Sequence, residues 1–337
     1  MAQELEGELA RVAARYATAI TPLMEGLIDA EDRADPIAAQ FLPHRDELIT
    51  TSQERADPID DGGFQVAPGL IHRYCDRVLL KLVSACPVYC RFCFRREMIG
   101  PGQDAPLRGD RFAAALAYIA AHEEIWEVIL SGGDPFVLSA ARVEEVSRAL
   151  GAIAHVKILR WHTRVPIVDP GRITPAFVQA LRAGKAIAWV AVHANHPREL
   201  TLEARSAIGR LVDAGIPVVS QSVLLRGVNA DPETLEALMR AFVEARVKPY
   251  YLHHPDLAPG TARFRLPISE GQDIMRHLHA HASGLCQPTY VLDVPDGAIK
   301  APLTPAYARD AADGWQMRAS DGGWRSYPPA NPSQEHS

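Results

Sequence analysis

The stretch VLLKLVSACPVYCRFC (residues 78–93) joins a run of apolar residues to three closely spaced cysteines. The run has the composition of a buried β-strand, and the cysteines follow where that strand would end. It is the first of six short apolar runs; the others are EVILSG (127–132), ILRWHT (158–163), WVAVHA (189–194), VVSQSVLL (218–225) and PYYLHH (249–254). After the first gap the runs recur about every 30 residues, which is the length of one strand–helix unit.

Helix signals fill the gaps between these runs. Thr174-Pro175 and Asp231-Pro232 each predict an N-cap followed by proline at the first helical position, and Gly184 predicts a helix end. Alternating strands and helices predict parallel strands with helices outside them. An eight-unit barrel would need two more strands than the sequence provides. We therefore expect an α/β fold, an open partial (β/α)6 TIM-like barrel with its site at the carboxyl ends of the strands.

The positions of the strand runs predict three parts, and composition limits the kind of protein. We expect a helical N-terminal extension (1–70), the barrel (71–265) and a C-terminal segment (266–337). The 337 residues are 47% hydrophobic, which is ample for a buried core. The net charge of −6 without a basic tract argues against nucleic acid as a partner. No signal peptide or apolar run of membrane-spanning length is present, and clustered thiols suit a reducing compartment, so we expect a cytoplasmic protein without membrane contact.

The three clustered cysteines predict an iron–sulfur centre. Cys86, Cys90 and Cys93 would lie in the loop directly after the first strand. Zinc usually takes four ligands, and neither Cys75 nor Cys286 has a neighbouring cysteine that would complete a second ligand pair. A 4Fe-4S cluster held by three cysteines leaves one iron open to a substrate or cofactor. The spacing therefore favours a cluster over structural zinc or buried thiols.

This CxxxCxxC spacing after a first strand resembles that of the radical S-adenosylmethionine enzymes. Seven ordered blocks over about residues 65–325 narrow the resemblance to the lysine 2,3-aminomutase family: APGLIHRYCDRVLLKL, CRFCFRR, SGGDP, HANHP, QSVLLRGVN, KPYYLHHPDLAPG and VLDVPDGAIKAPL. The resemblance implies an isomerase that moves an amino group between adjacent carbons. It also implies three cofactors, namely a 4Fe-4S cluster, S-adenosylmethionine and pyridoxal phosphate. One branch of the family supplies β-lysine for modification of elongation factor P.

The resemblance also implies cofactor-binding residues. Cys86, Cys90 and Cys93 would hold the cluster. The residues matching the S-adenosylmethionine site are Gly132, Gly133, Asp134, His193 and Gln221. Without the resemblance, the glycines could form a plain turn, and the two polar strand residues could be satisfied core groups.

Pyridoxal phosphate would be carried by Lys300, seven residues after Asp293, as in the family. Arg73 and Arg77 resemble the family's phosphate contacts. In an extended chain their spacing of four would place both side chains on one side. Surface arginines on an edge strand are the alternative.

Charge suggests which amino acid is bound. Arg95 matches the family's contact to the substrate carboxylate, since a guanidinium suits a carboxylate. Asp256 and Asp293 match two aspartates that receive the ε-ammonium of lysine, and they would repel glutamate. Individually, either aspartate could be a cap or turn residue. We expect L-lysine as the substrate, with arginine or another amino acid as the alternative.

Some features depart from the family pattern. Members with interlocked subunits carry zinc-binding cysteines where this chain has Asp231 and a cysteine-free tail, so we expect no zinc. His253 stands where the family often has an aromatic residue. We still expect a homo-oligomer and an electron donor such as flavodoxin or ferredoxin. A non-catalytic iron–sulfur relative is the alternative of a different class.

Overall fold

The computed structural model describes residues 2–103, 105–294, 299–312, 314–319 and 322–328. Within this part, ten strands form one sheet whose spatial order, β1 to β10, follows the chain. Its seven central strands are parallel: β3 (Arg77–Val83), β4 (Glu127–Gly132), β5 (Ile158–Thr163), β6 (Ile187–His193), β7 (Val218–Val223), β8 (Lys248–His253) and β9 (Thr289–Asp293). Six of them coincide with the predicted runs, which confirms the partial α/β barrel. β9 is a further parallel strand that the sequence analysis missed.

A helix follows each of the first six parallel strands. These helices are α4 (Gly109–Ala121), α5 (Ala140–Gly151), α7 (Pro175–Leu181), α8 (Leu202–Asp213), α9 (Pro232–Glu244) and α10 (Ile268–His281), with the short α6 (Val165–Val168) before α7. The predicted caps are confirmed, because Thr174 accepts a hydrogen bond from the backbone of Phe177 and Asp231 accepts one from Thr234. α9 buries Leu235, Leu238, Met239 and Phe242, the spacing of one helix face packed on a sheet.

The N-terminal extension packs against the cysteine loop. It contains α1 (Ala2–Arg15), α2 (Pro22–Glu25), α3 (Pro36–Phe41) and the 3-10 helices Arg45–Leu48 and Gly62–Phe64. Glu47 is fully buried and pairs with both Arg91 and Arg96 of the cysteine loop. The backbone of Arg91 also donates to the carbonyl of Gln40 at 2.8 Å. The extension therefore helps to fix the loop that carries the three cysteines.

The first edge of the sheet is antiparallel and corrects one prediction. β1 (Gln65–Ala67) pairs with β2 (Leu70–Tyr74), and β2 pairs with β3. Tyr74 is the register partner of Arg77, so the chain reverses between these residues. The extended conformation predicted for residues 73–77 is therefore wrong. Arg73 and Arg77 lie on neighbouring strands rather than on one side of a single strand.

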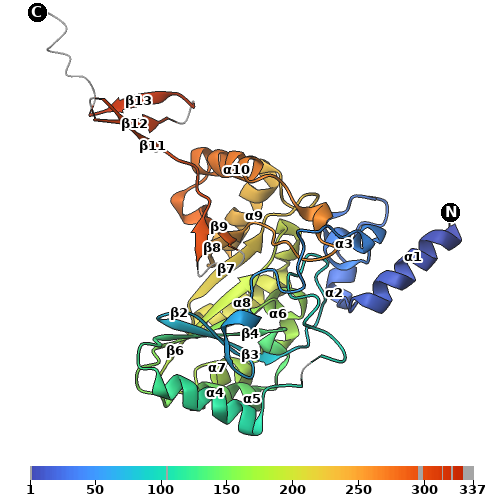
Figure 1. Cartoon of the computed structure of the whole chain (residues 1–337), viewed down its shortest axis with the longest axis vertical. Coiled ribbons are helices and arrows are strands. Elements are labelled where there is room, and N and C mark those ends of the chain that lie inside the picture. The colour runs from blue at the N-terminus through green and yellow to red at the C-terminus, as the bar shows by residue number, and fades with distance from the viewer. Residues whose placement is uncertain (1, 104, 295–298, 313, 320–321, 329–337) are drawn as a thin grey trace, which may run out of the picture.

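The other edge extends the same sheet past residue 265. β10 (Lys300–Pro302) pairs antiparallel with β9, which makes Lys300 the register partner of Asp293. The loop 295–298 between them and the tail 329–337 lie outside the described residues. β11 (Ala308–Ala311), β12 (Gly314–Arg318) and β13 (Trp324–Tyr327) form a separate antiparallel sheet that projects from the body (Figure 1). Among the described helices, none has the length and apolar character needed to cross a membrane.

Candidate active site

A pocket of about 400 Å³ lies along the inner face of the parallel strands and includes their carboxyl ends, where the chemistry of such barrels is expected. It contains every site residue singled out from the sequence. These are Arg73, Arg77, Cys86, Cys90, Cys93, Arg95, Gly132, Gly133, Asp134, His193, Gln221, Asp256, Asp293 and Lys300. The fold therefore brings the two groups, the cysteine loop and the segment around Lys300, into one cavity.

The cysteine loop has the chemistry of a cluster site. All three cysteines are free thiols. Burial, with the neighbouring charge of Cys90, raises the pKa of Cys93 to about 11, and burial raises the pKa of Cys86 well above its usual value. Such thiols become ligands only when a metal centre displaces their protons. Among the described residues, no three His, Cys, Asp or Glu side chains converge closely enough for a single ion.

Gly132 and Gly133 have a clear structural requirement. A Cβ on Gly132 would lie 2.3 Å from the carbonyl oxygen of Val83, and one on Gly133 would lie 2.3 Å from that of Ala85. Gly132 also has a φ of +115°. Only glycine permits both this conformation and this close approach. The turn after β4 is thus pressed against the backbone that leads into the cysteine loop, and it still lines the pocket.

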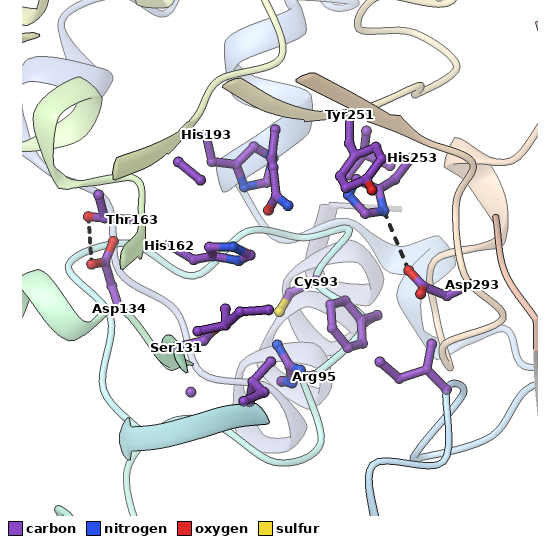
Figure 2. A pocket seen from close by; sticks show the side chains of 18 of the residues that line it. Cys93, Arg95, Ser131, Asp134, His162, Thr163, His193, Tyr251, His253 and Asp293 are labelled. Carbon is purple, nitrogen blue, oxygen red and sulfur yellow. Dashed lines mark hydrogen bonds and ion pairs between the residues drawn. The ribbon is translucent and has the colours of Figure 1, made fainter. Parts of the chain in front are cut away.

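Asp134 ties the ends of two strands together. Its carboxylate accepts a hydrogen bond from Thr163 Oγ1 at 2.7 Å (Figure 2). It also accepts hydrogen bonds from the backbone of Arg164 at 2.7 Å and from that of Phe136 at 3.0 Å. Burial raises its pKa. These bonds account for the side chain without a ligand, so its proposed cofactor contact would use the remaining lone pairs.

His193 and Gln221 are register partners on β6 and β7. His193 Nε2 lies 3.3 Å from Asn195 Oδ1. Burial, together with the positive charge of Arg164, lowers the pKa of His193 to about 3. Its ring is therefore neutral at physiological pH and suits hydrogen bonding rather than charge pairing.

Lys300 and Asp293 form an ion pair across the β9–β10 ladder. His253 Nδ1 lies 3.5 Å from the same carboxylate oxygen (Figure 2). Burial acts to raise the pKa of Asp293, but the contacts with His253 and Lys300 dominate and lower it. Burial lowers the pKa of Lys300 despite Asp293. An amine that loses its proton more readily is suited to covalent chemistry with a carbonyl group.

Asp256 differs sharply from Asp293. It follows β8 and has no cation bound directly to it in the described structure. Burial and the nearby negative charge of Asp293 raise its pKa to about 7. The two carboxylates thus have opposite pKa shifts within one pocket.

Three arginines on the cysteine side pair with two carboxylates, and Arg95 and Arg73 share Asp61. Arg95 Nε donates to Asp61 Oδ2 at 2.9 Å, and Asp61 Oδ1 also lies 3.9 Å from Arg73 Nη2. Arg77 pairs with Asp76 at 2.8 Å. Asp61 was not predicted, because it reaches the pocket from a loop far from the matching strands.

Sequence reasoning also missed polar residues on β5. Arg160 and His162 are two residues apart on this strand, so both face the pocket. Arg160 pairs with Glu127 of β4 at 2.8 Å. Figure 2 shows His162 between Asp134 and the His253–Asp293 pair. Polar residues inside the run ILRWHT were the available signal, the same one that identified the polar residues of β6 and β7.

Comparison with known proteins gives concordant matches. The Radical SAM superfamily matches residues 80–239. The chain is 41% identical to the L-lysine 2,3-aminomutase of Acetoanaerobium sticklandii, covering 86% of this chain and 69% of that protein. It is 40% identical to the L-lysine 2,3-aminomutase of Fusobacterium nucleatum, covering 90% and 71%. It is also 35% identical to the glutamate 2,3-aminomutase of Clostridioides difficile, covering 88% and 69%.

Proposed function

The chain belongs to the lysine 2,3-aminomutase family of radical S-adenosylmethionine enzymes, and we propose that it converts L-lysine to β-lysine with pyridoxal phosphate as an additional cofactor. The observation that supports this proposal most directly is that one pocket holds the three cysteines, the half-buried Lys300 and the pair Asp256 and Asp293. A protein that only carried electrons through a cluster would need neither a lysine in the pocket nor an acidic pair beside it.

The residues present fit the three cofactors. The thiols of Cys86, Cys90 and Cys93 would hold the 4Fe-4S cluster, and the pocket wall formed by β4, β6 and β7 would hold S-adenosylmethionine. Lys300 would hold pyridoxal phosphate, with Arg73 at its phosphate. When bound, these cofactors supply an organic radical that abstracts hydrogen and a conjugated ring that stabilises the rearranging radical.

The chain's own residues would bind and orient the substrate. Arg95 would receive the α-carboxylate through its Nη atoms, because Asp61 already occupies Nε. Asp256 and Asp293 would receive the ε-ammonium. In the structure the ammonium of Lys300 contacts Asp293, which supports recognition of a primary amine at this point. Once Lys300 is engaged with its cofactor, Asp293 would be available to the substrate.

Charge also supports lysine over glutamate. Asp293 keeps its negative charge because its pKa is lowered, and Asp256 is ionised above about pH 7. A distal carboxylate would face both, so its binding would be opposed. We further propose a homo-oligomer that receives electrons from a low-potential carrier such as flavodoxin or ferredoxin.

The test is an anaerobic assay of reconstituted protein with S-adenosylmethionine, pyridoxal phosphate, a reductant and L-lysine. Products are separated by chiral derivatisation and identified by mass spectrometry, with arginine and glutamate in parallel. We expect β-lysine, lost in Cys90→Ala and Lys300→Ala. The controls are Cys75→Ala and Lys185→Ala, whose side chains are exposed.

The other outcomes identify which part of the proposal fails. Rearranged arginine without rearranged lysine would transfer the proposal to an arginine mutase. Deoxyadenosine without any rearranged amino acid would leave the radical chemistry intact and refute the substrate. An intact cluster with neither product would favour a non-catalytic relative.

A further inference from the structure

Arg164 contacts one of the three clustered cysteines. It follows β5, and its Nη1 donates a hydrogen bond to Cys90 Sγ at 2.8 Å. The arginine is buried, with 5% of its surface exposed. An arginine keeps its charge throughout the physiological range, so a cation lies directly on a sulfur of the cysteine loop.

The guanidinium is held firmly in this position. Its Nη2 donates to Gln40 Oε1 at 2.7 Å and to Glu199 Oε2 at 2.6 Å. Its central carbon lies 4.6 Å from the ring centroid of Phe41. Nη1 is thereby directed at Cys90, whereas a flexible surface arginine would have no fixed direction. The third nitrogen, Nε, is buried and has no hydrogen-bond partner among the described residues.

Two separate segments supply these supports. Gln40 and Phe41 come from α3 of the N-terminal extension, and Glu199 ends the 3-10 helix Pro197–Glu199 after β6. Glu199 is itself fully buried and also accepts from Gln40 Nε2 at 3.0 Å. Buried polar groups from two distant segments thus hold one guanidinium in place through its Nη2 atom, while its Nη1 atom contacts Cys90.

We propose that Arg164 is a positioning residue that fixes the Cys90 sulfur and makes the cluster easier to reduce. The inference rests on the proposed cluster at Cys86, Cys90 and Cys93. Reduction adds one electron, taken from a low-potential donor, and so adds one negative charge to the cluster. A hydrogen bond and a positive charge at a ligand sulfur stabilise that reduced state and raise its potential.

The test is a potentiometric titration of reconstituted protein without S-adenosylmethionine, followed by electron paramagnetic resonance of the reduced cluster. We compare wild type with two variants. Arg164→Gln removes the positive charge, and Arg164→Lys keeps the charge but lacks the two Nη atoms that bind Cys90 and the supporting residues at the same time. We expect a more negative potential in Arg164→Gln and an intermediate one in Arg164→Lys. Arg142→Gln is the matched control, because Arg142 is buried on α5 outside the pocket.

Each outcome bears on the proposal. Equal potentials in wild type and both variants, at full iron content, would overturn it. If both variants fold by circular dichroism but lose iron while Arg142→Gln retains it, fixing the Cys90 sulfur is supported. Absence of any cluster in the wild type would refute the proposed function itself, which separates the two failures.

Discussion

Asp256 should make binding of a cationic substrate depend on pH. Its pKa of about 7 arises from burial and the nearby charge of Asp293, so in the free enzyme it is largely protonated below neutrality. Asp293 remains ionised there, because its pKa is lowered. An ammonium group favours the ionised form of Asp256, so binding must release its proton whenever the pH lies below about 7.

The magnitude follows from this proton release. For each pH unit below the pKa of Asp256, affinity should fall about tenfold, or about 1.4 kcal/mol, until the pKa of the complex is reached. Above about pH 7 affinity should become constant. Binding of the cationic ligand should therefore become tighter as the pH rises. A site that needed a protonated group would show the opposite dependence.

A suitable probe is 6-aminohexanoate, which has the carboxylate and distal ammonium of lysine but no α-amine. Calorimetric titration of the cofactor-loaded enzyme from about pH 5.5 to about pH 8.5, in buffers of different ionisation enthalpy, measures affinity and proton release together. Asp256→Asn should bind more weakly and without the pH dependence, whereas Asp213→Asn on the surface should match wild type. Flat wild-type affinity, or an unchanged slope in Asp256→Asn, would refute the reasoning.

Three further predictions concern neighbouring residues. Asp61→Ala should reduce the preference for lysine over 1,5-diaminopentane, which lacks the carboxylate. We expect the ratio of the two dissociation constants to change by roughly tenfold, since Arg95 loses a charged partner. Equal weakening of both ligands would indicate only structural damage. Glu47→Gln should lower the free energy of unfolding by about 3–5 kcal/mol in urea titration, because it breaks buried ion pairs. Gly133→Ala should lower iron incorporation, because its Cβ would lie 2.3 Å from the Ala85 carbonyl oxygen; normal iron content would contradict this account of the turn.

The sequence predicted the barrel well because its parallel strands carry apolar residues on both faces, one face packed in the core and the other lining the pocket. Such strands appear as continuous apolar runs, and the proline-started helices between them carry their own caps. β9 was missed because its buried residues are few, and its last residues, Leu292 and Asp293, are only half buried. The turn between β2 and β3 was missed because Cys75-Asp76 lacks the glycine or asparagine that marks a tight hairpin.

The site residues likewise divide into those that a local sequence pattern predicted and those that it did not. Those in matched blocks were found because motif and strand position agreed, as for Cys86 and His193. Asp61, Gln40 and Arg164 were missed because their roles depend on contacts between segments distant in sequence. A buried carboxylate from the N-terminal extension has no local pattern that predicts its partner. Only the packing of that extension on the cysteine loop reveals it.

The open sheet explains how two chemistries share one cavity. The cysteine loop follows β3 near one edge of the sheet, and Lys300 begins β10 at the opposite edge. Cys93 and Lys300 are 207 positions apart in the sequence. Both nevertheless line the same pocket, because the sheet curves without closing. Arg73 on β2 and Asp293 on β9 thus face the same ligand space, as cofactor and substrate held together would require.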